Sequence, residues 1–595
     1  MMTVKERLSA FRAAMAESDC DVFIIPSSDP HSSEYAPAHD TAWEYFSGFS
    51  CENANLVIAK ESAALWVDGR FFGAADSALK DTGIDSMHMG VKGVPTVYEW
   101  IKENVKENMT LGYCATTMPL SQKRKLQKIC DENKAKLLDL PLVDRVWVED
   151  RPALPSSEAW ILDTKYAGAS AKEKLDTLRG ILDKEGCTAT LVTTLDSVAW
   201  LLNLRAADVD NTPYALAFCY VDKNEAVLFI DSSRISEKAK KTLSDVNVKL
   251  MGYSEMPEFI ANGKNKETVL IDPSTLNAAL DNALRGNSNY KVIEGKNPIA
   301  MLKAVKNETE LACTKKAHIN DGVSMVRFQM ELERRLASGE KLRETDIDTI
   351  LHKYRSSVDG FITESFPTIA AYGENAAKMH YAPMVGADAV IEKKGFLLVD
   401  SGATYYDGTT DITRTYAVGE LTEEEKLAYT RVLRCHIDVA MAVWKDGATG
   451  GELDMLARQP LWRYMLDYRC GTGHSVSHVG AVHEGPHSLR PHNSIAFVPG
   501  MIVTDEPGIY EDGKIGIRIE NELVCAEAGE SEYGKFLRFE PITYVPIDMS
   551  CVLVDELTRE ERAYINEYHS EVYNKLSPLL NDEEKEWLGN KCQMV

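Results

Sequence analysis

Apolar positions repeat with the same spacing in two parts of the N-terminal half. Residues 7–25 (RLSAFRAAMAESDCDVFII) and 174–192 (KLDTLRGILDKEGCTATLV) align without a gap. In both segments, apolar residues at helical spacing precede a short turn and a β-rich run. Two amphipathic helices can match by coincidence, but the shared offset over helix, turn and strand favours two related α/β domains. The paired positions include Leu8 and Leu175, Phe11 and Leu178, Met15 and Leu182, and Cys20 and Cys187.

Changes in composition predict the domain boundaries. The segment 143–160 (VDRVWVEDRPALPSSEAW) gathers prolines and serines towards its end, which predicts a linker near residue 155. A long stretch of strong helix formers begins near residue 305. We therefore predict three domains, 1–155, 156–305 and 306–595.

The order of elements in the last domain predicts an α+β fold of two similar halves. The first half has the helix from about residue 305 and a second from Thr345, where TDID offers a capping box. β-like runs follow at 361–372 and 395–402. The second half repeats the order, with helices opening at Thr422 and spanning about 452–466, then β-like runs at 501–506 and 516–525. The tail after residue 545 is predicted to be helical.

Charge and cysteine usage exclude several classes of protein. The formal net charge is −25, with 91 acidic and 66 basic residues, so nucleic acid or an anionic membrane is not the expected partner. The N-terminal segment is charged and has no apolar core of a signal peptide. Twelve cysteines occur without a CxxC pair, which indicates reduced thiols. A cytoplasmic protein is the expectation.

Four acids stand on otherwise apolar β-like runs, where an unpaired carboxylate is energetically unfavourable. Asp400 ends GFLLVD, Asp411 begins DITRTYAV, Glu506 ends MIVTDE and Glu520 lies within GIRIENELV. Between the two pairs lies a glycine-rich stretch that carries His474. Each acid taken alone fits a structural salt bridge. Together, four acids and one histidine predict an oxygen-rich site for two divalent ions.

Strand periodicity assigns faces to the last of these runs. Successive side chains of a strand point to opposite faces. Ile517 and Ile519 are therefore predicted to face the core, while Arg518 and Glu520 share the opposite face. Arg518 is then predicted to hold the metal-binding acids in place without binding the metal itself.

The motifs LLVDSG, DGTTDITRT, GTGHSV, VHEGP, TDEPGIY and GIRIEN resemble the aminopeptidase P group of metallopeptidase family M24B, whose catalytic domain has the pita-bread fold. The segments SDPHSSEYAP, VDGR, VDRVWVEDRP, LDSVAWLLNLR and KAVKNETE resemble its long, three-domain members over nearly the whole chain. The implied fold is two creatinase-type α/β domains followed by a pita-bread α+β domain.

The resemblance implies a metal site and a mechanism. Asp400 chelates one ion, Asp411 and Glu520 bridge both, and His474 and Glu506 complete the other. The family usually uses Mn²⁺; Co²⁺ and Zn²⁺ also suit such ligands. Two ions about 3.5–4 Å apart generate a hydroxide nucleophile. Glu506 is the implied proton carrier towards the leaving amine.

Further residues match family positions that contact substrate. His380 in KMHYAP and His483 in VHEGP are implied to contact the scissile bond, and Tyr510 and Arg518 to line the pocket. Arg70 matches a substrate-reaching arginine of the N-terminal domain. One position departs from the pattern, because Cys470 stands where many relatives carry a histidine. A small packed residue is the interpretation of this cysteine, and His478 is the candidate for compensation.

The leading hypothesis is an Xaa-Pro aminopeptidase, which releases the first residue from peptides with proline at position two. A prolidase, restricted to Xaa-Pro dipeptides, is the alternative, and the two N-terminal domains favour the aminopeptidase. Pita-bread domains also occur as metal-free binding modules and in creatine hydrolysis without metals; the complete ligand set opposes both. The resemblance further implies a homodimer.

Overall fold

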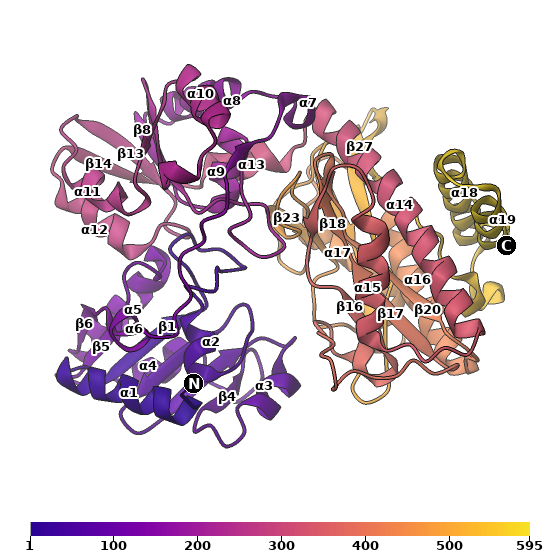
Figure 1. The fold of residues 1–595 in the computed structure, drawn as a ribbon, viewed down its shortest axis with the longest axis horizontal. Helices are drawn as coiled ribbons and strands as arrows, with labels where there is room; N and C mark the ends of the chain where they lie inside the picture. Colours follow the sequence, from indigo (N-terminus) through magenta and orange to yellow (C-terminus); the bar gives the residue numbers. More distant parts are fainter. Residues whose placement is uncertain (1) are drawn as a thin grey trace. The chain divides into compact units, whose positions relative to one another are not determined.

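The computed structural model describes residues 2–595, which form two compact units (Figure 1). None of the helices in this range is long and apolar enough to cross a bilayer. All twelve cysteines are free thiols. The first unit comprises 2–161, 169–210 and 214–299, and the second comprises 162–168, 211–213 and 300–595.

The first unit contains two six-stranded sheets of equivalent topology, with strand orders β4-β3-β2-β1-β5-β6 and β12-β11-β10-β8-β13-β14. In each sheet the strand of the repeated segment, β1 or β8, is antiparallel to one neighbour and parallel to the other. The helix of each repeated segment, α1 or α8, buries its apolar positions on its sheet. The strands are β1 Val22–Pro26, β2 Asn55–Ala59, β3 Ala63–Val67, β4 Asp85–His88, β5 Thr110–Tyr113, β6 Lys136–Asp139, β8 Ala189–Val192, β10 Phe218–Asp222, β11 Ala226–Phe229, β12 Val248–Met251, β13 Glu267–Ile271 and β14 Tyr290–Glu294, with a short pair β7 Trp160–Ile161 and β9 Leu204–Arg205.

Helices connect these strands. They include α1 Val4–Glu17, α2 Ala42–Ser47, α3 Phe72–Ala78, α4 Val97–Asn104, α5 Leu120–Asn133 and α6 Leu142–Val146, followed by α8 Ala171–Lys184, α9 Leu195–Leu202, α10 Glu237–Asp245, α11 Met256–Ala261 and α12 Ala278–Gly286. Helix α13 Pro298–Ala304 begins in the first unit and ends in the second. The prediction of two related α/β domains is confirmed, because both the connectivity and the direction of the strands repeat.

The second unit has the predicted order of two helices followed by strands, occurring twice. Its helices are α7 Thr164–Ala167, α14 Glu308–Ala337, α15 Glu344–Arg355, α16 Glu423–Ala440, α17 Gly450–Trp462, α18 Arg559–Leu576 and α19 Asp582–Lys591. Its strands are β15 Phe361–Glu364, β16 Ile369–Tyr372, β17 Phe396–Ser401, β18 Ala403–Tyr405, β19 Gly408–Thr409, β20 Ile412–Ala417, β21 Val443–Lys445, β22 Gly473–Ser475, β23 Glu484–Leu489, β24 Ile502–Asp505, β25 Gly508–Glu511, β26 Ile515–Arg518, β27 Asn521–Ser531 and β28 Gly534–Pro541.

Helix starts follow the predicted capping chemistry at one position and depart from it at another. The Thr422 hydroxyl accepts the Glu425 backbone N–H, and the Glu425 carboxylate accepts the Thr422 backbone N–H, as the sequence predicts for the cap of α16. The prediction that α15 begins with a cap at Thr345 is wrong. The helix begins at Glu344, because Asp346 accepts the Arg343 N–H, while the Thr345 hydroxyl donates to Asp388 instead.

The strands that carry the four acids are tied together by backbone pairing. β17 and β20 are antiparallel, with Asp400 opposite Thr413. β24 and β27 are antiparallel, with Asp505 opposite Asn521. The apolar residues on the other faces of these strands are buried in the hydrophobic core, so the polar residues are directed away from it. In this way the acids reach one region from four separate strand ends.

Candidate metal centre

Three of the predicted ligands meet directly. One ligand atom each from Asp411, His474 and Glu520 lies within 4.8 Å of the others. Asp411 precedes β20, His474 lies in β22, and Glu520 lies between β26 and β27. Gly473 allows this approach, because a Cβ at that position would lie 1.8 Å from the carbonyl oxygen of Thr504.

The other two predicted ligands border this group. The Glu506 carboxylate is 3.5 Å from His474 Nε2, and Asp411 is 3.3 Å from the same nitrogen. Arg518 donates both to Asp400 and to the Thr413 hydroxyl, which itself donates to Glu520, so Asp400 borders the same group. The structure therefore brings all five predicted ligands to one site.

The titration of these groups reflects burial and crowding of like charge. Burial, with the Asp400 and Glu506 carboxylates, raises the pKa of Asp411 to about 6. Burial and three neighbouring carboxylates raise the pKa of Glu520 well above its usual range. Burial alone would lower the pKa of His474, but Asp411 and Glu506 raise it to about 9. Four carboxylates held this closely require a compensating positive charge.

A divalent ion fits the donor set. Among residues 2–595, the buried Oδ1 atom of Asp400 has no hydrogen-bond partner, although its Oδ2 atom accepts a bond. A buried carboxylate oxygen without a donor is costly unless a cation contacts it. Carboxylate oxygens with one imidazole suit hard divalent ions such as Mn²⁺. The residues present therefore match the group that the sequence predicts.

Arg518 connects the acids to the neighbouring hairpin of β25 and β26. Its Nη2 atom donates to Asp400 Oδ2 over 2.5 Å, and its Nη1 atom donates to the Tyr510 hydroxyl over 2.7 Å. Thr413 donates to Glu520 over 2.6 Å and accepts from Arg518 Nε. Ile517 and Ile519 are buried in the core on the opposite side, as predicted. Arg518 thus orients two of the acids and positions Tyr510 beside them.

The two histidines predicted to contact substrate are placed differently. The His483 ring lies edge-on to the His474 ring, with centroids 4.3 Å apart, so it borders the metal centre. His380 follows the short 3-10 helix Gly373–Ala377, which contacts the β25–β26 hairpin. It is partly buried. Its contact with substrate stays a prediction.

Arg70 belongs to the first unit. There, its guanidinium donates to both carboxylate oxygens of Asp68, at 3.0 and 2.7 Å. A contact between Arg70 and substrate also stays a prediction.

Cys470, which stands where many relatives carry a histidine, and nearby His478 are both held by structural contacts. Burial, with the nearby Glu506 carboxylate, raises the pKa of the Cys470 thiol to about 12, so the thiol is neutral and a poor nucleophile. It packs beside the core with Tyr510. The suggestion that His478 compensates is not supported, since its ring nitrogens lie 3.1 Å from the Thr314 hydroxyl and 3.0 Å from the Tyr166 carbonyl.

Two supporting residues were not predicted from the sequence. Glu522 Oε1 accepts the backbone N–H of Asp411 over 2.9 Å and lies 3.2 Å from His318 Nε2, with both side chains fully buried. The signal was present, because Glu522 stands two residues after Glu520 and shares its strand face. His318 lies in the middle of α14, and no local pattern connects it to β27.

A buried arginine holds the backbone of a ligand. Arg414 donates to the carbonyl oxygens of Glu520 and Val545 and to the Tyr568 hydroxyl of α18, over 2.5, 2.7 and 2.9 Å. The C-terminal helix thereby supports the metal centre.

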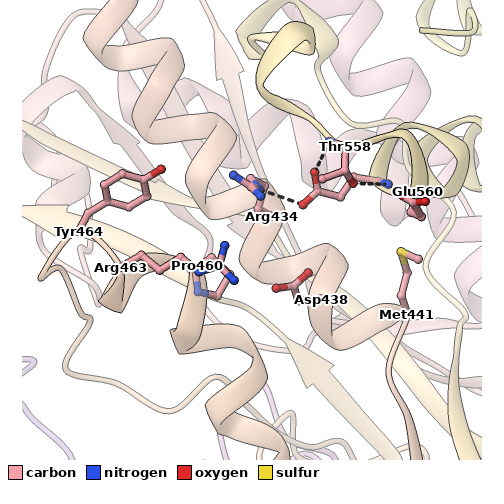
Figure 2. A pocket seen from close by; sticks show the side chains of 9 residues that line it. Arg434, Asp438, Met441, Pro460, Arg463, Tyr464, Thr558 and Glu560 are labelled. Carbon is pink, nitrogen blue, oxygen red and sulfur yellow. Dashed lines mark hydrogen bonds and ion pairs between the residues drawn. The ribbon is translucent and has the colours of Figure 1, made fainter.

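A separate cavity of about 330 Å³ lies beside α16 and α17 (Figure 2). Arg434 and Glu561 form an ion pair there, 2.9 Å apart. None of the predicted ligands or substrate residues lines it, so it has no part in the site. Its lining residues are Arg434, Asp438, Met441, Pro460, Arg463, Tyr464, Thr558, Glu560 and Glu561.

Metal affinity is expected to fall as the pH is lowered. With a pKa of about 9, His474 carries a proton near neutral pH, and a metal needs the neutral imidazole, so binding releases this proton. Affinity then falls about tenfold per pH unit for each released proton, and more steeply below about pH 6, where Asp411 is also protonated. Calorimetric titration with Mn²⁺ in buffers of different ionisation enthalpy measures the released protons. An affinity independent of pH between 5.5 and 8 would contradict this account.

Comparison with known proteins agrees with the fold and the site. Models of the creatinase/prolidase N-terminal domain match residues 7–146 and 150–310, metallopeptidase family M24 matches 312–527, and the C-terminal region of this peptidase matches 535–595. The chain is 38% identical to a probable Xaa-Pro aminopeptidase P of Laccaria bicolor over 99% of this chain and 93% of that protein. It is 36% identical to aminopeptidase P2 of Arabidopsis thaliana, covering 100% and 89%.

A solved structure has the same fold over the full length. The X-prolyl aminopeptidase of Caenorhabditis elegans, described as a cytosolic enzyme with a di-nuclear active site, has a TM-score of 0.95, 32% identity and complete coverage of both chains. Two creatinase-type domains, a pita-bread domain and an acid-rich centre define a metallopeptidase. The chain belongs to the Xaa-Pro aminopeptidase P group of metallopeptidase family M24.

Proposed function

We propose that this protein hydrolyses the Xaa-Pro bond at the N-terminus of peptides and releases the first residue. The observation that carries this proposal is the meeting of Asp411, His474 and Glu520 within 4.8 Å, with Glu506 on one side. Proline has no amide N–H and a fixed φ, so a dedicated enzyme is needed for its bond. The full-length similarity to Xaa-Pro aminopeptidases supports this function over a prolidase.

The side chains of the centre have separate tasks. Two divalent ions, when bound, supply a water of lowered pKa as nucleophile and polarise the scissile carbonyl. Asp400, Asp411, His474, Glu506 and Glu520 would hold these ions. Mn²⁺ is the proposed metal, because the donors are mainly carboxylate oxygens.

Glu506 is proposed to move the proton. Its side chain is 21% exposed, against 6% for Asp411, so it is the more accessible of these two carboxylates. It takes a proton from the attacking water and passes it to the leaving proline nitrogen. His483, beside His474, and His380 are proposed to hydrogen-bond the peptide at the scissile bond, and Tyr510 and Arg518 to line the substrate pocket. Arg70 is proposed as a further contact to substrate.

The cellular and oligomeric setting is also a proposal. A cytoplasmic protein is supported by free thiols throughout the described chain and by the cytosolic nematode relative. A homodimer is supported by exposed apolar side chains in and just after α17, and sedimentation velocity of the intact protein tests it. These side chains are Met455, Leu456, Trp462, Tyr464 and Met465, 38–96% exposed.

Comparison of two substrates tests the function. Purified protein with Mn²⁺ is expected to release arginine from Arg-Pro-Pro and to lose this activity in a chelator. A prolidase would cleave the dipeptide Ala-Pro and leave the tripeptide intact. Protein that binds Mn²⁺ and cleaves neither peptide would contradict the proposed function.

A further inference from the structure

Three charged residues form a buried cluster that the proposed mechanism does not use. The Glu484 carboxylate lies 2.9 Å from Lys303 Nζ and 2.5 Å from Lys306 Nζ. The three side chains are only 1–3% exposed. Ser477 Oγ adds a hydrogen bond to Glu484 over 2.8 Å, and Lys306 Nζ donates to the Lys303 carbonyl.

This cluster neighbours His483 in the sequence and, through strand pairing, lies beside the segment that carries His474. Glu484 follows His483 directly and begins β23. In the β22–β23 pair, Glu484 lies opposite Ser475, the residue after His474. His483 lies in a bend directly before β23, so the backbone on its C-terminal side is held by Glu484. When Glu484 is fixed in the cluster, the backbone of His483 is restrained at the place where its ring meets the His474 ring.

The cluster also connects this hairpin to a distant segment. Lys303 lies in the last turn of α13, and Lys306 precedes Asn307, the cap of α14. Lys306 is further held by its backbone N–H, which donates to Gly500. Charges removed from water are stable only when closely paired, so the two lysines and Glu484 hold each other at fixed positions.

We propose that Lys303, Lys306 and Glu484 are positioning residues that fix the orientation of His483 for the reaction. They touch neither the peptide nor the metal and act through the start of β23. This inference rests on the proposed function, because it assigns His483 a task in peptide cleavage.

Removing only the charge of Glu484 distinguishes a positioning role of this residue from a role in folding. Glu484→Gln keeps the size and an oxygen for Ser477 but removes the charge that both lysines face. We expect kcat for Arg-Pro-Pro to fall about 10–100-fold, as for other residues that orient groups at metal sites, with KM changed much less. The bound Mn²⁺ per chain stays as in the unaltered protein. The matched control, Glu561→Gln, removes the carboxylate paired with Arg434 and leaves kcat unchanged.

A double-mutant cycle tests the route through His483. In a His483→Ala background, Glu484→Gln should cause little further loss, because the group that it positions is already absent. An equal loss in both backgrounds, or full activity of Glu484→Gln, overturns the proposal. If Glu484→Gln does not fold, Lys303→Met/Lys306→Met/Glu484→Gln removes all three charges at similar volume, and full kcat in that variant also overturns it.

An NMR measurement that needs no peptide cleavage tests this proposal independently of the proposed function. The ¹⁵N signals of the His483 ring, assigned by their loss in His483→Ala, are expected to shift or broaden in metal-free Glu484→Gln but not in Glu561→Gln. Unchanged signals overturn the positioning role. Absence of peptide cleavage by the unaltered protein with Mn²⁺ instead overturns the proposed function and leaves the ring signals to decide the orientation.

Discussion

Replacement of Glu506 by glutamine is expected to lower kcat for Arg-Pro-Pro by about a thousandfold or more. Glutamine keeps the shape of the side chain but cannot carry the proton, and it is a weaker metal ligand; a positioned acid–base group alone contributes about 10²–10⁴-fold. The Glu506 backbone N–H still donates to the Thr472 carbonyl, so the loop is retained. Steady-state kinetics at saturating Mn²⁺ measure the effect.

A nearby glutamate provides the control for this change. Glu511 ends β25, five residues further on, and its carboxylate pairs with Lys514 at the surface. Glu511→Gln should leave kcat and KM unchanged. Activity of Glu506→Gln within tenfold of the unaltered protein would contradict the proton-carrying role.

Replacement of Asp411 by asparagine is expected to have the second large effect, a loss of bound metal together with activity. Asp411 is a buried carboxylate 3.3 Å from His474 Nε2, and it is proposed to contact both ions. Asparagine removes one negative charge from the centre while its backbone N–H keeps the bond to Glu522. We expect fewer than two Mn²⁺ per chain and a loss of kcat of about a thousandfold or more, since metal activation of the nucleophile fails.

Metal analysis by mass spectrometry after dialysis, together with kinetics, measures this outcome. Asp407→Asn is the matched control, because Asp407 lies four residues earlier and pairs with Lys316 instead of facing the centre. Two tightly bound Mn²⁺ and normal turnover in Asp411→Asn would show that this acid is not a ligand.

The features predictable from the sequence are those with a local pattern. The repeated α/β segments and the order of helices and strands in the last domain follow from periodicity, and the structure confirms that fold. The four acids and the histidine could be selected because acids are unfavourable on apolar strands unless a cation compensates them. Their convergence depends on strand pairing, such as Asp400 opposite Thr413, which only the structure provides.

The features that could not be predicted are long-range contacts of ordinary residues. Arg414 bonds residues more than a hundred positions away, and Lys306 meets Glu484 across 178 residues. No local spacing encodes such pairs. The start of α15 also differs from the prediction, because the Thr345 hydroxyl donates to Asp388 in a distant loop and so does not cap the helix.

The central claim is that five side chains of the last domain hold two ions at one catalytic centre. Anomalous X-ray scattering from crystals grown with Mn²⁺ tests it most directly. We predict two peaks about 3.5–4 Å apart, in contact with Asp400, Asp411, His474, Glu506 and Glu520. A single peak, or manganese bound away from these residues, would contradict the account.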